Sequence, residues 1–323
     1  MKRTFLVLCV SVCICAAHPA AAQHGKQRGK HHAAKKSAPA AAAIDEQMLA
    51  TQVMLDRAGY SPGEIDASRG TSTERALAAY TKSGGKADAL PSDALTAYTI
   101  TEQDAAGPFT PSIPTDMMAK SKLPSLGYTT VAESLGERFH TSPALLKRLN
   151  PSAKFAAGES IKVPNVAPTA AGPVGTSGRQ SDPNAAAQTT VTVHKSTSDL
   201  VVTDSGGKTL MYAPVTTGSE HDPLPIGEWK VTGVQRDPKF HYNPALFWDA
   251  DSRQSKATIP SGPNSPVGVV WIDLSRPHYG LHGTPEPSKI GKTESHGCVR
   301  LTNWDAVKLA SLVKPGTRVV FAE

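Results

Sequence analysis

The chain has 323 residues, enough for two or three domains, with 39% hydrophobic, 6% aromatic and 19% charged residues and a formal net charge of +6. This apolar content excludes a fully disordered chain, while 26 glycines and 26 prolines indicate linkers and turn-rich β structure. No run beyond the N-terminus approaches the ~18 apolar residues that a membrane span needs, and no cluster of Lys and Arg favours nucleic acid as a partner.

Residues 1–22 have the pattern of a secretory signal peptide. Lys2 and Arg3 form a basic start, an apolar stretch runs from Phe5 to Ala17, and Ala20–Ala22 supplies a small-residue cleavage site. An uncleaved anchor helix is the alternative, but the apolar stretch is short for a membrane span. We therefore expect export, cleavage near Ala22, and no stable membrane insertion afterwards.

The cysteines are divided between this leader and one later position. Cys9, Cys13 and Cys15 lie in the expected signal peptide, so cleavage leaves Cys298 alone. No disulfide can then form within the mature monomer. A lone thiol in an oxidising compartment is a liability unless its chemistry is used, which makes Cys298 a candidate nucleophile.

Residues 23–43 are a basic low-complexity spacer, and residues 44–98 are expected to form a small helical unit. Leu49 and Val53 stand four apart, as on one helix face, and Thr71 with Glu74 fits a capping box for a second helix.

This unit resembles the helical peptidoglycan-binding domain family. The resemblance lies in the segments Gln52–Tyr60, Gly63–Asp66 and Gly70–Leu77. The sequence departs from the family pattern at Ala67, where a glycine is usual. The resemblance implies a helical fold related to peptidoglycan binding.

Residues 99–123 are a Thr/Pro-rich linker, and residues 124–165 form a second small unit. Thr130 with Glu133 fits a capping box, Ser142 followed by Pro143 starts another helix, and a closing strand is expected at 161–164. This predicts strand, helix, helix and strand in about 40 residues.

That order resembles the LysM family, which binds the glycan of peptidoglycan. The matching segments are Tyr128–Val131, Leu149–Pro151 and Ala157–Glu159. The alternative is a helical hairpin with only a packing role.

Residues 166–188 are a linker by composition, and the pattern of β structure begins at Thr189. Val191 and Val193 alternate with polar residues, and Asp204–Gly207 is a hairpin turn between strands at 200–203 and 208–212. Further strands are expected at 228–232 and 267–274, and one helix at 303–313 with Asn303 as its cap. The 189–323 region is therefore predicted to be an antiparallel sheet or sandwich with its own core.

The segment 278–301 contains the groups that cysteine catalysis needs. A nucleophilic cysteine requires a base, backbone N–H groups for the oxyanion, and a glycine that lets the substrate approach closely. Cys298 has His296 two residues before it, Gly297 beside it, and the pair His282–Gly283 sixteen residues upstream. The alternatives are a buried structural cysteine, or a zinc site of His282, His296 and Cys298 whose spacing is unusual for zinc.

These residues resemble the signature of the L,D-transpeptidase catalytic domain family. The resemblance spans about 189–323 and rests on His282–Thr284 and Ser295–Leu301, with further similarity at Pro225–Gly227 and Gly262–Gly268. It implies a β-sandwich that remodels peptidoglycan and needs no metal or organic cofactor. Such enzymes cleave a tetrapeptide stem before its terminal D-Ala and transfer the acyl group to an amine.

The resemblance also implies catalytic roles. Cys298 is the nucleophile that forms a thioester, and His282 is the base that activates it. The Gly283 carbonyl orients the His282 imidazole, and His296 lines the site as a candidate for assisting proton transfer.

The neighbouring residues are expected to hold the oxyanion and the substrate. The N–H groups of Gly297 and Cys298 are candidates for the oxyanion hole. Ser295 and Arg300 are expected to order the loop or contact the stem peptide, and some family members have Asn in place of Arg300. Tyr279 is a candidate pocket residue, although strand alternation would place it opposite His282.

Residues 236–263 form a long loop that contains Phe240, Tyr242, Phe247 and Trp248. Aromatic residues in a long polar loop suggest a lid over the substrate, and a loop packed on the edge of the sandwich is an equal alternative.

The leading hypothesis is a multidomain L,D-transpeptidase secreted across the inner membrane to the periplasm or cell wall. Its partners would be stem peptides and glycan, and the acceptor amine would come from another stem peptide, an outer-membrane lipoprotein or a free D-amino acid. The alternatives are an L,D-carboxypeptidase or cross-link hydrolase that uses the same thioester, and a noncatalytic wall-binding protein.

Overall fold

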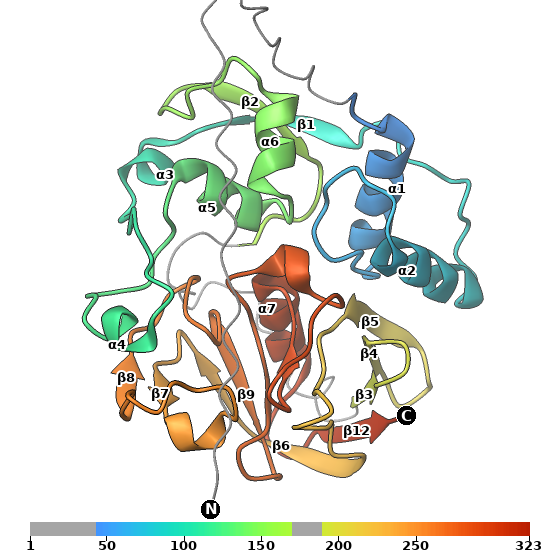
Figure 1. The fold of residues 1–323 in the computed structure, drawn as a ribbon. Coiled ribbons are helices and arrows are strands. Elements are labelled where there is room, and N and C mark those ends of the chain that lie inside the picture. Colours follow the sequence, from blue (N-terminus) through green and yellow to red (C-terminus); the bar gives the residue numbers. More distant parts are fainter. Residues whose placement is uncertain (1–42, 170–188) are drawn as a thin grey trace, which may run out of the picture. The chain divides into compact units, whose positions relative to one another are not determined.

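The computed structural model describes residues 43–169 and 189–323 (Figure 1). The expected signal peptide, the spacer up to residue 42 and the linker from residue 170 lie outside the described residues. No helix in the described ranges is both long and apolar enough to cross a membrane.

The first two helices are α1 (Glu46–Arg57) and α2 (Thr71–Lys82). The expected capping box at Thr71 does not form, because α2 begins one residue earlier than expected and its N-cap is Gly70, which has no side chain. The loop between the helices turns through Ala67 at a φ of 57°. This left-handed conformation favours glycine, so Ala67 is a position where the alanine side chain is strained.

The small sheet crosses the boundary expected at residue 98. Strand β1 (Leu95–Thr99) pairs antiparallel with β2 (Ser160–Pro164), so the first strand of the second unit comes from residues assigned to the helical unit. The segment expected as a plain linker contains two short helices, α3 (Glu102–Ala106) and α4 (Met117–Lys120). The expected strand at the start of the 124–165 unit is therefore replaced by β1.

Helices α5 (Val131–Arg138) and α6 (Pro143–Leu149) follow. Their N-caps are Thr130 and Ser142, as expected. The expected capping box is incomplete, since the Glu133 carboxylate accepts from the backbone N–H of Thr129, at 2.7 Å, and not from that of Thr130. One hydrophobic core joins both expected units; it contains Leu49, Val53 and Ile65 together with Leu135, Leu145 and Leu146.

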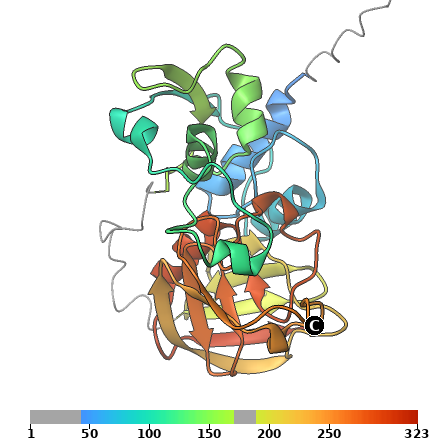
Figure 2. The ribbon, with the colours of Figure 1, turned by 60° about the vertical axis from the view of Figure 1, so that its left-hand side comes forward.

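The C-terminal region is built on an eight-stranded sheet with the strand order β11-β10-β9-β6-β12-β3-β4-β5 (Figure 1 and Figure 2). Its strands are β3 (Thr190–His194), β4 (Asp199–Thr203), β5 (Thr209–Pro214), β6 (Gly227–Arg236), β9 (Val270–Leu274), β10 (Gly280–His282), β11 (Val299–Arg300) and β12 (Arg318–Ala322). The remaining elements are β7 (Phe240–Tyr242), β8 (Ala257–Ile259), the 3-10 helices η2 (Pro244–Leu246) and η3 (Pro287–Lys289), and α7 (Asn303–Leu312).

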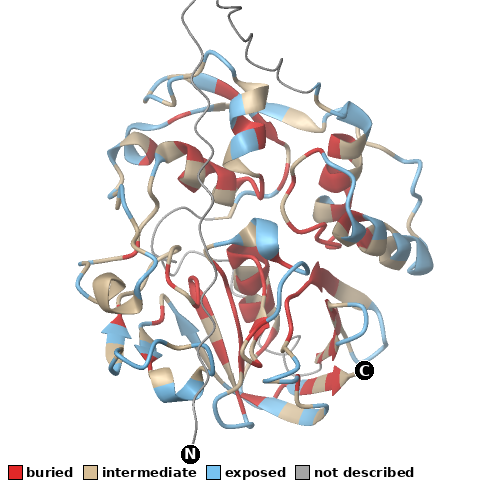
Figure 3. Cartoon of the chain, viewed as in Figure 1, coloured by how far each residue is buried: buried red, intermediate tan, exposed pale blue. Residues whose placement is uncertain are grey.

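This sheet differs from the expected antiparallel sheet or two-layer sandwich. All eight strands are hydrogen-bonded in one continuous order, and the pairs β12–β3 and β10–β11 are parallel. Strand β6 pairs with β12 on one side and β9 on the other, with a bulge between Val231 and Gly233 that bends it. The result is a curled mixed sheet, and Figure 3 shows its buried residues along the strands and α7.

The start of α7 contacts the helical region upstream. The N-cap of α7 is Thr302 and not Asn303, which is the first helical residue. Asp305 accepts a hydrogen bond from the Ser61 hydroxyl at 2.8 Å, and Trp304 stacks on His140 at 5.4 Å between ring centroids. Trp304 is 3% exposed, so these contacts bury one end of α7.

Candidate active site

The parallel pairing of β10 with β11 joins the two halves of the motif. Leu281 lies beside Val299 in the register, and both side chains are buried in the core. Because side chains alternate along a strand, His282 and Arg300, which are partners in the register, lie on the opposite face. Cys298 directly precedes β11 and lines the same pocket as these two residues. His282 and Cys298, sixteen residues apart in the sequence, are thus brought together by the pairing of two adjacent strands.

His282 is held as a neutral imidazole. It is 4% exposed, and its Nδ1 donates to the Gly283 carbonyl at 2.7 Å, the interaction expected from the resemblance. This bond leaves Nε2 as the basic nitrogen. Burial and the nearby Arg300 guanidinium lower the pKa of His282 to about 4. Trp271 of β9 stacks on the imidazole, with ring centroids 5.3 Å apart.

Cys298 is a half-buried free thiol. Its Sγ donates to the His278 carbonyl, with a separation of 3.7 Å. Burial raises the pKa of the Cys298 thiol to about 11, partly offset by a backbone hydrogen bond from Gly280 and by the charge of Arg300. At neutral pH the resting site therefore contains a thiol and a neutral imidazole.

Close packing fixes the glycines of the site. At Gly283 a Cβ would lie 2.1 Å from Asn303 Oδ1, and at Gly297 it would lie 2.7 Å from the ring of Tyr279. Gly297 also has a φ of 96°. Neither position can hold a larger residue without displacing its neighbours. Tyr279 lines the pocket, because it precedes β10 and the alternation of that strand does not apply to it.

Ser295 orders the loop that carries Cys298. It is 3% exposed, its hydroxyl donates to the Cys298 carbonyl at 2.6 Å, and its N–H donates to the Thr217 carbonyl at 2.9 Å. Arg300 anchors the same loop by donating to the Glu294 carbonyl at 3.3 Å.

His296 connects this loop to the aromatic segment. Its Nε2 lies 2.8 Å from Asp249 Oδ1. Its ring also meets Phe247 edge to face at 4.9 Å and lies 5.8 Å from the ring of Trp248. Trp248 is 59% exposed and contacts His221 at 4.4 Å. We call residues 243–251 the flap.

The pocket has a volume of about 780 Å³. Its walls combine aromatic side chains of β7, the flap and β9 with charged and polar side chains; they include Phe240, Tyr242, Phe247, Asp249, Trp271, Asp273, Tyr279, His282, His296, Cys298 and Arg300. The aromatic segment thus lines the site, as the lid hypothesis requires. Among the described residues, no group of three His, Cys, Asp or Glu side chains could hold a metal ion.

Three site residues were not singled out from the sequence. His278 has a φ of 67°, a strained conformation that directs its carbonyl to the thiol. Trp271 and Asp249 come from β9 and the flap, far from Cys298 along the chain. Only tertiary structure brings these two residues to the site, so local sequence carries no signal for them.

Comparison with known proteins identifies relatives of the C-terminal region. A family model described as YkuD, the L,D-transpeptidase catalytic domain, matches residues 188–321. The chain is similar to the L,D-transpeptidase YkuD of Bacillus subtilis, with 30% identity over 197 residues that cover 58% of this chain and 90% of the relative. It is also similar to YqjB of Bacillus subtilis, with 31% identity over 139 residues that cover 41% of this chain and 70% of the relative.

A solved structure is also similar. The L,D-transpeptidase from Mycobacterium smegmatis has 17% identity and a TM-score of 0.35 to this chain. The match covers 42% of this chain and 59% of that chain, so the chain spans about three fifths of the solved protein.

Proposed function

Because the chain belongs to the L,D-transpeptidase family, we propose that it is an exported enzyme that remodels peptidoglycan through a thioester on Cys298. The observation that carries the proposal is that Cys298, His282 and Arg300 line one pocket. The substrate is a tetrapeptide stem, and the bond cleaved is the one before its terminal D-Ala.

The neutral resting state determines how the first step proceeds. As Cys298 Sγ attacks the carbonyl carbon, the thiol proton passes to Nε2 of His282, which is free because Nδ1 is bound to Gly283. The carbonyl oxygen becomes an oxyanion near the N–H groups of Gly297 and Cys298. Arg300 adds positive charge to the site, which favours the transition state.

Collapse of the intermediate completes acylation. The bond between the carbonyl carbon and the D-Ala nitrogen breaks, and the imidazolium of His282 returns its proton to that nitrogen. The product is a thioester on Cys298 and free D-Ala. An acceptor amine then attacks the thioester, loses a proton to His282, and regenerates the thiol.

We further propose transfer to an amine over hydrolysis as the main fate of the thioester. The flap supports this, since it places Phe247 and Trp248 against His296 of the loop that carries Cys298. Apolar rings at the mouth of a site exclude water and hold an acceptor in place. The amine comes from a stem peptide, an outer-membrane lipoprotein or a free D-amino acid in the periplasm or cell wall.

The test is incubation with purified tetrapeptide muropeptide and a second amine donor, followed by mass analysis. We expect a cross-linked dimer or amine adduct in excess of free tripeptide, and a thioester on the trapped enzyme. Cys298→Ala should abolish all products, and His282→Ala should lower the rate ~10²–10⁴-fold. D-Ala release by Cys298→Ala would contradict the mechanism, and tripeptide alone at every amine concentration would identify a carboxypeptidase.

A further inference from the structure

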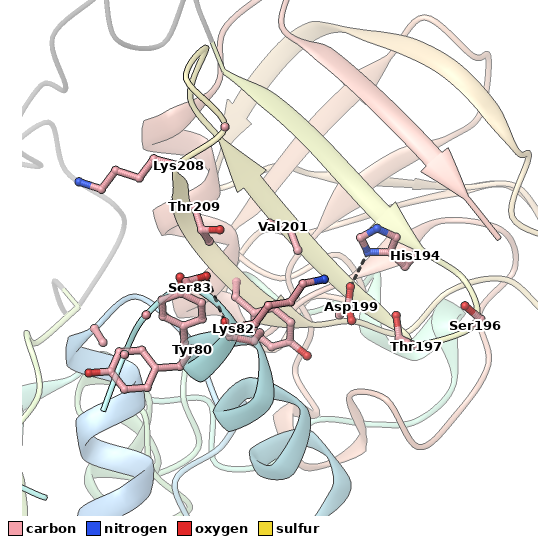
Figure 4. A pocket seen from close by; sticks show the side chains of 17 residues that line it. Tyr80, Lys82, Ser83, His194, Ser196, Thr197, Asp199, Val201, Lys208 and Thr209 are labelled. Carbon is pink, nitrogen blue, oxygen red and sulfur yellow. Dashed lines mark hydrogen bonds and ion pairs between the residues drawn. The ribbon is translucent and has the colours of Figure 1, made fainter. Parts of the chain in front are cut away.

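A second pocket of about 950 Å³ shares no lining residue with the Cys298 pocket. It lies between the C-terminal end of α2 and the edge of the sheet formed by β3, β4 and β5 (Figure 4). Backbone hydrogen bonds fix these two walls together, since Tyr212 N–H donates to the Gly59 carbonyl and Ser61 N–H donates to the Tyr212 carbonyl, each at 2.9 Å.

Three tyrosines form an ordered aromatic wall in this pocket. Tyr60 stacks on Tyr212 at 6.2 Å and meets Tyr80 edge to face at 5.4 Å. Tyr60 and Tyr212 are buried, while Tyr80 is half-buried and presents ring surface to the pocket. The backbone at Gly85 packs so closely on Tyr80 that a Cβ there would lie 2.4 Å from the ring. The Tyr80 ring is therefore held in place before any ligand binds.

Polar groups surround the aromatic wall. The Tyr212 hydroxyl is buried and makes no hydrogen bond within the described part of the chain. Asp199 is 8% exposed; its Oδ1 binds His194 at 2.7 Å, and no described residue donates to its Oδ2. Lys82 has no ion-pair partner among the described residues, and Figure 4 shows its side chain extending across the pocket toward Asp199.

We propose that this pocket binds a short stretch of the peptidoglycan glycan, as an accessory site separate from catalysis. The proposal rests on the function proposed above. A pyranose ring presents an apolar C–H face that suits Tyr80, and hydroxyl groups that suit a buried carboxylate and a buried phenol. Lys82 matches the carboxylate that each muramic acid residue carries when its peptide has been removed. The ligand proposed for this pocket is thus a carboxylate-bearing oligosaccharide.

The experiment uses residues 42–323, which form one compact unit, with Cys298→Ala to prevent turnover. Peptide-free glycan strands and glycan-free tetrapeptide are titrated separately, and amide NMR shifts are followed at Ser83, Gly84, Gly85, Thr197 and Asp199. These positions line the pocket and distinguish it from residues 124–165. We expect the glycan, and not the peptide, to shift them in a saturable way.

Variants test the contacts. Tyr80→Ala should weaken binding at these positions ~10-fold or more, Tyr80→Phe should retain it, and Tyr212→Phe should weaken it ~3–10-fold. Lys82→Ala should weaken binding and reduce its salt dependence, whereas Lys230→Ala, an exposed lysine on β6, should not. Shifts by tetrapeptide alone, no shifts, or equal affinity in all variants would overturn the proposal.

Thioester formation on soluble tetrapeptide separates this proposal from the enzymatic one. With Cys298 restored, Tyr80→Ala should form the thioester at the rate of the unsubstituted chain. If no variant forms the thioester, the proposed enzymatic function is wrong. The glycan titration then still tests the proposed glycan-binding site by itself.

Discussion

At the scale of single residues, the site is dominated by the cost of burying charge. Burial raises the pKa of the Cys298 thiol and lowers the pKa of the His282 imidazole, and both shifts favour the neutral form. A preformed thiolate–imidazolium pair is thus disfavoured, and proton transfer must accompany attack on the substrate. Arg300 acts on both groups, since its charge lowers the pKa of His282 and of Cys298 alike.

The first prediction concerns pH. Thioester formation requires neutral His282, so kcat/KM should rise as the pH increases through about 4 and then stay level to pH 8. Arg300→Asn removes a positive charge that opposes protonation, so the acid limb should move up by ~0.5–1 pH unit. The profile is measured by mass spectrometry of the acyl-enzyme. Arg236→Asn, on β6 outside the pocket, is the control, and an unmoved limb in Arg300→Asn would refute the coupling.

The second prediction concerns Trp271, whose ring covers the His282 imidazole and whose Nε1 donates to Asp273 at 2.5 Å. Trp271→Leu frees the imidazole to rotate and should lower kcat ~3–10-fold, whereas Trp271→Phe keeps a stacked ring and most of the rate. Steady-state kinetics on tetrapeptide would measure this. Equal losses in both variants would show that the stack itself is unimportant.

At the scale of elements, a polar contact of 2.8 Å between Asp249 and His296 joins the flap to the loop that carries Cys298. We predict that Asp249→Asn loosens the flap, admits water, and raises the ratio of free tripeptide to dimer ~2–5-fold. Asp251→Asn is the matched control, because Asp251 lies in the same flap but pairs with Arg253. An unchanged product ratio in Asp249→Asn would argue against a role for the flap in excluding water.

Helix α5 contributes a buried carboxyl to its junction with α7. Burial raises the pKa of Glu137 to about 8, although a hydrogen bond with Asn303 lowers it. The folded chain keeps this proton while the unfolded chain loses it above about pH 4.5, so stability falls as the pH rises from 5 to 8.

We therefore predict that Glu137→Gln removes part of that pH dependence. From pH 5 to pH 8 the variant should become more stable relative to the unsubstituted chain by ~1–2 kcal/mol in free energy of unfolding. Its melting temperature should therefore rise relative to that of the unsubstituted chain over the same range. Thermal unfolding at several pH values measures it. Glu102→Gln, at an exposed position in α3, should show no such trend, and a constant difference for Glu137→Gln would be evidence against the buried proton.

Local signals explain which elements were predictable. Alternating valines and the turn at Asp204–Gly207 indicated β3, β4 and β5, and the caps Thr130 and Ser142 lie where the sequence placed them. Strand β1 has no clear apolar alternation, and its partner residues lie about 65 positions later, so no local pattern marks it.

The candidate site divides in the same way. The two short motifs contain the thiol, the imidazole and the carbonyl that orients it, so the sequence was sufficient to find them. Asp249 and Trp271 reach the pocket through the flap and the curled sheet. Their part in the site depends on long-range pairing that periodicity cannot indicate.

At the scale of the whole molecule, residues 43–169 cover one end of the catalytic region at Trp304 and Asp305. We predict that residues 189–323 alone still form the thioester, because they hold every proposed catalytic group. Their free energy of unfolding should be lower by ~1–3 kcal/mol, so their melting temperature should fall. They should also bind intact sacculi less tightly than residues 42–323, since linked weak sites reinforce one another. Equal melting temperatures and equal retention on sacculi would make the upstream region a spacer.

The pairing of β1 with β2 has a consequence for how such a chain can diversify. A recombination event that replaced residues 124–165 would remove β2 and leave β1 with an unpaired edge, beside a core that has lost Leu135, Leu145 and Leu146. The two expected upstream units therefore cannot be exchanged separately without disrupting both the small sheet and the core that they share.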